Sequence, residues 1–264
     1  MPEIAVIGGT GVYDPDMLQD VEENTVATPY GDVRYMTGVL NAERVVFLAR
    51  HGSGHTVPPH LVNYRANIWA VKKLGVKWVI ATAAVGSLNQ EFKPGHFVLV
   101  DQFIDFTKTR NSTFFDGGNR GVAHVDMTEP YCPVLRQHLH RIGLELGLNV
   151  HAAGTYVCTD GPRFETPAEI RMFKTLGGDV VGMTSVPEVV LAKEAELCYA
   201  TICMVTNFAA GITDQKLTHQ EVLETFRLNS RHIKQLIARA IAALPSASQC
   251  GCRFAMREYG GFKL

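Results

Sequence analysis

TYVCTDGPRFE, residues 155–165, predicts a strand that stops at a sharp turn and is followed at once by a helix. Residues 155–158 are β-branched, aromatic or cysteine and include no breaker, which is typical of a strand. Gly161 and Pro162 end this strand, because glycine bends the chain and proline removes a backbone donor. Residues 166–169, TPAE, then have the pattern of a helix start, with threonine as N-cap and glutamate three residues later.

This turn presents an aromatic ring beside a carboxylate at the end of a strand, which is a good place to hold a flat heterocycle. Phe164 can stack on such a ring, and Glu165 can accept hydrogen bonds from ring N–H groups. The alternative is a purely structural role, with Phe164 in the core and Glu165 as a solvated loop charge.

Length and composition place the chain among ordinary globular proteins. Its 264 residues suffice for one large domain or two small ones, and contents of 46% hydrophobic and 19% charged residues are usual for a protein with a sizeable core. A net charge of −1 leaves no basic excess for nucleic acid and no polybasic run for a membrane surface. No apolar run reaches the roughly 18 residues of a membrane span, and the N-terminus has the pattern of a strand rather than a secretory signal. We therefore expect a cytoplasmic protein.

A second glycine-containing turn follows the first apolar run, residues 4–7. Residues 8–11, GGTG, can bring backbone N–H groups and the Thr10 hydroxyl to an anion. A dinucleotide-binding fingerprint fits poorly, because Asp14 stands where its last glycine should be and Pro15 follows where a long helix should run. A phosphate or ribose contact and a purely structural tight turn both remain open.

RHGSGH, residues 50–55, is a basic, glycine-rich loop directly after an apolar strand. Arg50 supplies a planar fork of donors suited to phosphate oxygens, and His51 adds one or two more. This pattern favours an anion site over a surface loop with incidental cations. AAVGS, residues 83–87, is a run of small residues at the exit of another strand, which keeps the backbone open to a ligand or allows close packing.

Strands alternate with helices along most of the chain. The expected strands are 4–7, 33–40, 44–48, 78–82, 97–100 extended by 102–106, 155–158, 180–183 and 199–206, and the expected helices are 62–74, 133–146, one from 166, 188–195 and 218–244. The alternation predicts an α/β fold, with a mixed, mostly parallel sheet surrounded by helices and a ligand site beyond the carboxyl ends of the strands. We expect a single domain at residues 1–245 and a C-terminal tail with a Cys-Gly-Cys motif at residues 246–264.

Six segments in consistent order resemble one family. They are residues 7–11 (IGGTG), 50–52 (RHG), 63–70 (NYRANIWA), 84–87 (AVGS), 161–165 (GPRFE) and 182–188 (GMTSVPE). Together they are similar to the trimeric purine nucleoside phosphorylases and 5′-methylthioadenosine phosphorylases of the nucleoside phosphorylase-I superfamily, from Ile4 to about Leu244. The resemblance is closest to the members that act on 6-oxopurines.

The resemblance implies a pentosyltransferase of purine salvage that catalyses reversible phosphorolysis. Inosine or guanosine and inorganic phosphate, the co-substrate, would give the free base and ribose-1-phosphate, with no metal and no cofactor. Such an enzyme must hold phosphate on one face of the sugar and neutralise charge on the departing purine. The positions that match the family's phosphate site are Thr10, Arg50, His51, Ala83 and Thr184. Those that match its nucleoside site are Ala84, Phe164, Glu165, Met183, Asn207, His219 and His124, with Tyr64 or His55 near the ribose. Among all of these, the expected catalytic residues are Asn207, Glu165, His51 and Arg50.

Two of these positions bear on the choice of purine. Glu165 can accept from N1–H of a 6-oxopurine, while Asn207 can donate to O6 and accept from N7–H as the base leaves. The methylthioadenosine branch has a small polar residue in place of Glu165 and an Asp-rich motif at residues 207–210, so this chain departs from it at both positions. A site built on buried hydrogen bonds discriminates strongly, because the wrong base leaves groups unpaired. The resemblance therefore favours 6-oxopurine nucleosides.

Other matched positions bear on the 5′ group and the assembly. His219 matches a histidine near the 5′-hydroxyl, which favours inosine and guanosine over their 5′-methylthio analogues. His124 matches a residue contributed by a neighbouring subunit, which implies a homotrimer. The tail motif at residues 250–252 resembles that of thermophilic dimers of trimers, with either disulfides or free thiols. Three other functions stay open: a methylthioinosine or methylthioadenosine phosphorylase, a non-catalytic nucleoside-binding protein, and a dinucleotide-dependent oxidoreductase, which Asp14 weakens.

Overall fold

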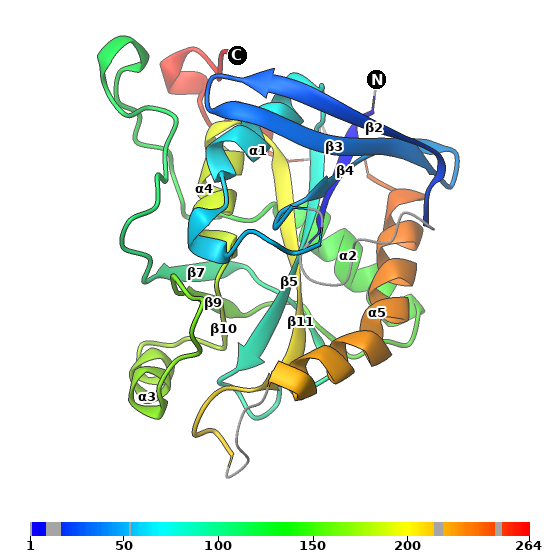
Figure 1. Ribbon diagram of the computed structural model, residues 1–264, viewed down its shortest axis with the longest axis vertical. Coiled ribbons are helices and arrows are strands. Elements are labelled where there is room, and N and C mark those ends of the chain that lie inside the picture. The colour runs from blue at the N-terminus through cyan, green and yellow to red at the C-terminus, as the bar shows by residue number, and fades with distance from the viewer. Residues whose placement is uncertain (1, 9–16, 53, 214–218, 246–249) are drawn as a thin grey trace.

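The computed structural model describes residues 2–8, 17–52, 54–213, 219–245 and 250–264, without the side chains of residues 219–224, 226 and 228. Over these ranges the chain forms one mixed sheet of 11 strands with helices packed around it (Figure 1). The strands are β1 (Ile4–Gly8), β2 (Gln19–Thr28), β3 (Gly31–Leu40), β4 (Glu43–Ala49), β5 (Trp78–Ser87), β6 (Phe97–Leu99), β7 (Gln102–Asp105), β8 (Val150–His151), β9 (Thr155–Cys158), β10 (Val180–Gly182) and β11 (Cys198–Phe208). The α-helices are α1 (Tyr64–Lys73), α2 (Pro133–Glu145), α3 (Pro167–Thr175), α4 (Ser185–Glu194) and α5 (His219–Ile241). The expected α/β class is confirmed.

Strand β5 is the centre of the sheet. On one edge it pairs in parallel with β1 from Trp78 to Ala81, and on the other edge it pairs in parallel with β11 along its whole length. Strand β10 joins the first edge only at Gly86 and Ser87, and it runs antiparallel to β5. Between these partners, residues 82–85 have no neighbouring strand on that edge within the described part of the chain. The gap leaves backbone and small side chains of β5 accessible in the middle of the sheet.

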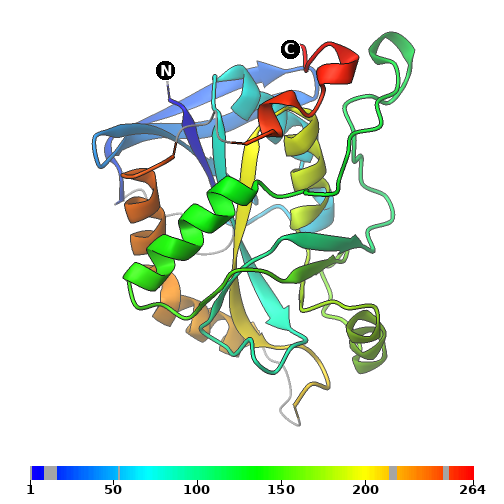
Figure 2. The same cartoon turned by 180° about the vertical axis from the view of Figure 1, so that it is seen from behind.

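The two faces of the sheet carry separate hydrophobic cores, because successive side chains of a strand point to opposite faces. On β1, Ala5 and Ile7 pack into the core covered by α1 and α4, whereas Ile4 and Val6 pack into the core covered by α2 and α5. Figure 2 shows α2, in green, lying across the second face. Among the described helices, none combines the length and the apolar character that crossing a membrane requires.

The helix start predicted at residues 166–169 is confirmed by its hydrogen bonds. The Glu169 backbone N–H donates to Thr166 Oγ1 at 3.2 Å, and the Thr166 N–H donates to the Glu169 carboxylate at 2.7 Å. This capping box satisfies two of the donors that a helix N-terminus leaves without intrahelical partners. It holds the segment before it, which includes Phe164 and Glu165, at a defined place at the start of α3.

Three parts of the chain differ from the sequence expectation. Strand β2 was not expected, because its sequence is polar and mostly exposed; it pairs with β3 at the edge of the sheet. Residues 97–106 form two strands rather than one, since β6 pairs with β11 and β7 pairs with β9. The tail, for which no pattern was found, packs on the core: Met256 is fully buried, and the Phe262 ring lies 5.3 Å from that of Trp69.

Candidate functional site

A cavity of about 380 Å³ lies along the gap in the sheet beside β5. Its walls come from residues that follow β4, β9 and β10, together with residues of β5 and the end of β11. Pockets that bind small molecules have volumes of about 300–1,000 Å³, so this cavity suits one small ligand or two adjacent ones. Of the residues singled out in the sequence, it brings together Arg50, His51, His55, Ala83, Ala84, Phe164, Glu165, Met183, Thr184 and Asn207.

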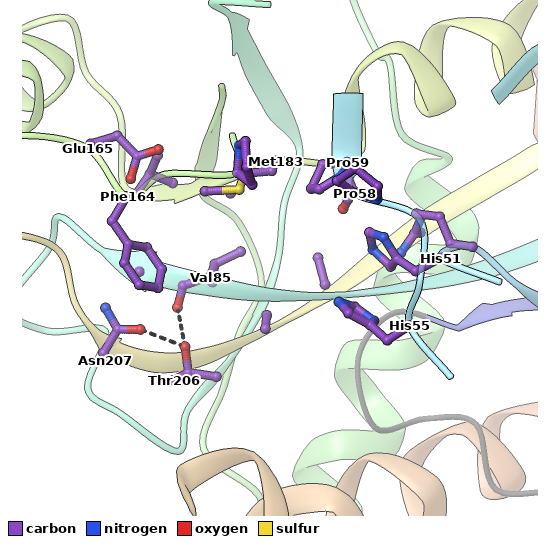
Figure 3. Close-up of a pocket in the computed structure, with 18 of the residues that line it drawn as sticks. His51, His55, Pro58, Pro59, Val85, Phe164, Glu165, Met183, Thr206 and Asn207 are labelled. Atoms are coloured by element: carbon purple, nitrogen blue, oxygen red, sulfur yellow. Dashed lines mark hydrogen bonds between the residues drawn. The ribbon is translucent and has the colours of Figure 1, made fainter. Parts of the chain in front are cut away.

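The cavity has two chemically different ends (Figure 3). His51 and His55 lie at one end, beside Pro58 and Pro59, and the two imidazole rings are 4.4 Å apart. Phe164, Glu165 and Asn207 lie at the other end, with Met183 between the two groups. The arrangement separates an end with two imidazole rings from an end with an aromatic ring, a carboxylate and an amide.

The small residues of β5 form the floor between these ends. Ala83 and Ala84 lie in the gap, where no strand covers that edge of β5 among the described residues. A Cβ atom at Gly86 would come within 3.3 Å of Asn207 Nδ2, so glycine is what allows the amide its position. The small residues at 83–87 therefore leave the backbone of β5 open to a ligand and also allow Asn207 to pack closely, two roles that the sequence had left as alternatives.

Arg50 is held by a buried carboxylate that the sequence analysis did not assign. Its Nε and Nη2 donate to the two oxygens of Glu188 at 2.7 and 2.6 Å, and Nη1 donates to the Thr82 carbonyl at 2.8 Å. Burial by itself would lower the pKa of Arg50, but Glu188 raises that pKa overall, so the guanidinium stays charged. Three of its five N–H groups are occupied by these bonds, which leaves one on each Nη for a ligand. The Arg50 guanidinium, which was expected to bind phosphate, thus makes two of these three hydrogen bonds to Glu188.

His51 has a defined tautomer. Its Nδ1 lies 2.8 Å from the Val57 carbonyl oxygen, and because a carbonyl only accepts, Nδ1 carries the hydrogen. Burial, together with the nearby Arg50 charge, lowers the pKa of His51 to about 4. At neutral pH the ring is therefore uncharged and its Nε2 is an acceptor, whereas the sequence analysis had treated His51 as a source of donors.

Glu165 is half-buried and hydrogen-bonded, so it is not a solvated loop charge. Its Oε1 accepts from the Thr159 hydroxyl at 2.7 Å. Burial raises the pKa of Glu165, and the Thr159 hydrogen bond opposes part of that rise. Phe164 is not in the core either, because 43% of its surface is exposed and its ring lies at the cavity. Both side chains are therefore available to a ligand.

Asn207 has half of its hydrogen-bonding capacity committed. Its Oδ1 accepts from the Thr206 hydroxyl at 2.7 Å, and its Nδ2 donates to the Phe208 carbonyl at 2.9 Å. These two bonds fix which way the amide faces, since the reverse orientation would place two acceptors together. One N–H and one lone pair of Oδ1 remain for a ligand.

Met183 and Thr184 follow β10 and line the middle of the cavity. Gly161 lies against the Met183 side chain with φ at +64°, and any Cβ there would collide with the Met183 sulfur. Thr184 is the N-cap of α4, but its side chain makes no capping hydrogen bond. The turn after β9 thus packs on the turn after β10 and holds Met183 in the cavity wall.

Arg110 is a second positioning residue that sequence reasoning missed. Its Nη1 donates to the carbonyl oxygens of Met183 and Val186 at 2.7 Å each, and its Nη2 donates to those of Thr159 and Asp160 at 3.1 and 3.0 Å. One guanidinium therefore joins both turns that carry the cavity wall. Nothing in the local sequence marks Arg110, because its partners come from distant segments.

Of the other predicted positions, two lie outside the described part of the structure and two are described but do not line this cavity. Thr10 lies outside the described residues. His219 begins α5, but its side chain also lies outside them. His124 is exposed on a loop, where its backbone N–H donates to the Tyr259 hydroxyl at 2.8 Å. Tyr64 is buried and its hydroxyl donates to the Pro59 carbonyl at 2.9 Å, so it supports the cavity rim.

Comparison with known proteins agrees with this geometry. The profile of the Phosphorylase superfamily matches residues 3–242. The 6-oxopurine nucleoside phosphorylase of Pyrococcus furiosus is 55% identical over 266 residues, which cover 99% of this chain and 100% of that protein. The S-methyl-5′-thioadenosine phosphorylase of Hyperthermus butylicus is 49% identical over 256 residues, which cover 95% and 92%.

A solved structure shows the same fold. The methylthioadenosine phosphorylase of Schistosoma mansoni, in complex with adenine, aligns with a TM-score of 0.87 at 37% identity, over 92% of this chain and 91% of that one. The matches in sequence and in structure both extend over most of the chain. The chain therefore belongs to the phosphorylase superfamily.

Proposed function

We propose that the protein catalyses the reversible phosphorolysis of 6-oxopurine nucleosides, inosine and guanosine, to the free base and ribose-1-phosphate. The observation that carries this proposal is that Glu165 and Asn207 lie at one end of a cavity whose other end holds His51 and whose lining also includes Arg50. Inorganic phosphate is the co-substrate, and the proposed reaction requires no cofactor. The similarity to the 6-oxopurine nucleoside phosphorylase of Pyrococcus furiosus supports the same choice.

Phosphate is proposed to bind at the end of the cavity that holds His51. Arg50 supplies its two remaining N–H groups, and its charge is kept by Glu188. The hydrogen phosphate dianion still has one P–O–H group, and the neutral His51 ring can accept it at Nε2. Thr184 adds a hydroxyl that is not used for helix capping. Ala83, in the gap of β5, contributes its backbone, and Thr10 completes the proposed set.

The purine is proposed to bind at the opposite end. The carboxylate of Glu165 accepts from N1–H, and from the 2-amino group of guanine. The remaining N–H of Asn207 donates to O6, and the remaining lone pair accepts from N7–H as the base departs. Phe164 stacks on the base above Ala84, and Met183 lies against the ribose. Charge that develops on the leaving purine is thus met by groups already oriented for it.

Substitution of Glu165 tests how the base is recognised. Glu165→Gln is expected to lower kcat/KM for inosine and guanosine by roughly 10- to 100-fold, because a hydrogen bond to a charged group is lost. Adenosine, which has no N1–H, should lose less. An equal fall in kcat/KM for all three nucleosides would contradict the proposal that Glu165 recognises the base. The measurement is kcat/KM for each nucleoside with phosphate, with Glu145→Gln, an exposed residue of α2, as control.

The same residue sets the acid limb of the pH profile. Because burial raises the pKa of Glu165, the carboxylate becomes protonated at a higher pH than an exposed glutamate. The value of kcat/KM for inosine should therefore fall as the pH decreases through this raised pKa, while the Glu165→Gln variant should lack that limb. A profile that is identical in the variant would show that another group causes the fall.

The 5′ group of the substrate separates this proposal from its main rival. The similarity to the S-methyl-5′-thioadenosine phosphorylase of Hyperthermus butylicus makes a 5′-methylthio nucleoside the second candidate. His219, proposed to lie near the 5′-hydroxyl, favours inosine. A panel of adenosine, inosine, guanosine and their 5′-methylthio forms, each with phosphate, should give the highest kcat/KM with inosine or guanosine. Higher values with the methylthio forms would replace the proposal by its rival. Binding of inosine without release of hypoxanthine in phosphate buffer would indicate a non-catalytic nucleoside-binding protein.

A homotrimer, or a dimer of trimers, is proposed as the active assembly. His124 does not line the cavity of its own chain, and Val122 beside it is 64% exposed. Both residues are therefore accessible to a neighbouring subunit. The loop would bring His124 to the cavity of a neighbouring subunit.

The proposed location is the cytoplasm, where the six free thiols are chemically stable.

A further inference from the structure

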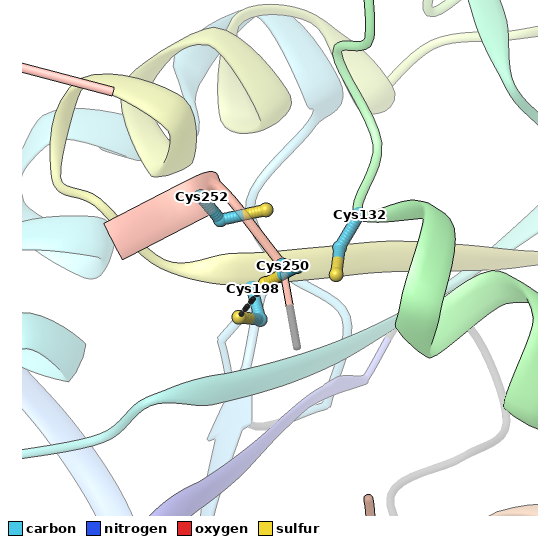
Figure 4. A group of neighbouring side chains, drawn as sticks. All are labelled: Cys132, Cys198, Cys250 and Cys252. Carbon is cyan, nitrogen blue, oxygen red and sulfur yellow. Dashed lines mark hydrogen bonds between the residues drawn. The ribbon is translucent and has the colours of Figure 1, made fainter. Parts of the chain in front are cut away.

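Four cysteines that are far apart in the sequence meet at one point on the second face of the sheet (Figure 4). Cys132 precedes α2, Cys198 begins β11, and Cys250 and Cys252 come from the tail. Their sulfur atoms all lie within 4.8 Å of one another. The four residues are 1–8% exposed, and all are free thiols.

We propose that Cys132, Cys198, Cys250 and Cys252 form a structural metal site that binds a zinc ion through four sulfur ligands. In a tetrahedral site with Zn–S bonds of about 2.3 Å, neighbouring sulfur atoms are about 3.8 Å apart. Here the Cys198 and Cys250 sulfur atoms are 3.2 Å apart, and all the other pairs lie within 4.8 Å. Small rotations of the side chains would therefore bring all four to equal distances from a central ion.

The surroundings of the cluster suit a thiolate–metal centre. Cys132 is the N-cap of α2, a helix of 13 residues, and its sulfur accepts a hydrogen bond from the Leu135 backbone N–H at 3.5 Å. Helix N-termini and N–H···S hydrogen bonds stabilise thiolate charge. Four thiolates around Zn²⁺ have a net charge of −2. Lys72 and Lys193 lie close enough to interact electrostatically with Cys198 and Cys252, and they reduce this excess.

The ligand backbones are already held in place. The Cys132 N–H donates to the Tyr199 carbonyl at 2.8 Å, and the Cys198 N–H donates to the Lys77 carbonyl at 2.9 Å. The four cysteines also belong to the hydrophobic core beneath α2 and α5, which excludes water. A dry site with four protein ligands and no open position is typical of structural zinc rather than catalytic zinc. Zinc is the expected metal because four sulfur ligands in a tetrahedral arrangement favour it over harder cations.

A metal here would attach the tail to the rest of the chain. Beyond Cys252, Met256 and Phe262 donate backbone N–H groups to the two oxygens of Glu196, both at 3.2 Å. Tyr259 accepts the hydrogen bond from the His124 loop. Loss of the metal should therefore loosen the tail and the loop that it supports, while the cavity at the other end of β5 stays intact.

The test is the metal content of the full-length protein, produced with a reducing agent and supplied with zinc. We expect mass spectrometry of the metal content to give one zinc ion per protein chain. The variants Cys132→Ser and Cys252→Ser should lose stoichiometric zinc, while Cys203→Ser, a buried cysteine of β11 outside the cluster, should retain it. Equal zinc in all of these proteins would overturn the proposal.

A second measurement does not depend on any variant being folded. Wild-type protein loaded with cobalt(II) should show the sulfur-to-cobalt charge-transfer absorption and the strong visible bands of a tetrahedral thiolate site. A chelator should also lower the Tm of the wild-type protein. Metal-free wild-type protein that binds no cobalt, or protein whose cluster cysteines are joined in disulfides by intact mass, would show that the four sulfurs are not metal ligands.

Discussion

Replacing Asn207 by alanine is expected to lower kcat for inosine by about 10²- to 10³-fold, the loss typical of one hydrogen bond that stabilises a transition state. The amide already has its orientation set by Thr206 and the Phe208 carbonyl, so the N–H and the lone pair that are proposed to meet the departing base need no reorganisation. The effect should fall on kcat more than on KM, because N7 acquires its hydrogen only as the glycosidic bond breaks. Steady-state kinetics with inosine and phosphate measure both constants.

A second substitution at the same position separates recognition from catalysis. Asn207→Asp keeps an acceptor for N7–H but replaces the donor to O6 by a negative charge, so it should disfavour inosine relative to adenosine. Asn24→Ala, on the peripheral strand β2, is the matched control and should retain wild-type rates. An Asn207→Ala variant with wild-type turnover would show that the amide does not contact the base.

Replacing Arg50 by alanine is expected to lower the free energy of unfolding by about 3–5 kcal/mol, because it leaves a buried carboxylate without its cationic partner. Glu188 is fully buried, and both of its oxygens accept from Arg50. The same change should raise KM for phosphate, since the two N–H groups proposed to bind it are lost. Urea unfolding and phosphate-dependent kinetics measure the two effects separately.

A double variant distinguishes the structural role of Arg50 from its role with phosphate. Arg50→Met with Glu188→Leu removes both buried charges together, and replacing a buried ion pair by apolar residues of similar size is often neutral for stability. The double variant should therefore recover most of the lost stability while its KM for phosphate stays high. Recovery of phosphate binding along with stability would mean that Arg50 acts only through the fold.

Local patterns predicted those parts of the fold that depend on neighbouring residues. The capping box at residues 166–169 is determined by side chains three residues apart, and it is present as expected. The strand at residues 155–158 is likewise short, apolar and closed by a turn, and it forms β9. Strand β2 was missed because a polar edge strand has no apolar period, and its pairing with β3 is what makes it a strand.

The sequence by itself determined the α/β class, the order of most elements, and the residue types that now surround one cavity. Only the tertiary structure decided how those residues are used. Arg50 is oriented by Glu188, 138 positions away, and Arg110 joins two turns through carbonyl groups that no local motif marks. The four cysteines likewise meet only after β11, α2 and the tail have packed together. The physical reason is that caps, turns and periodicity depend on contacts within a few residues, whereas ion pairs and ligand clusters depend on contacts between distant segments, which form only when the sheet and its two cores assemble.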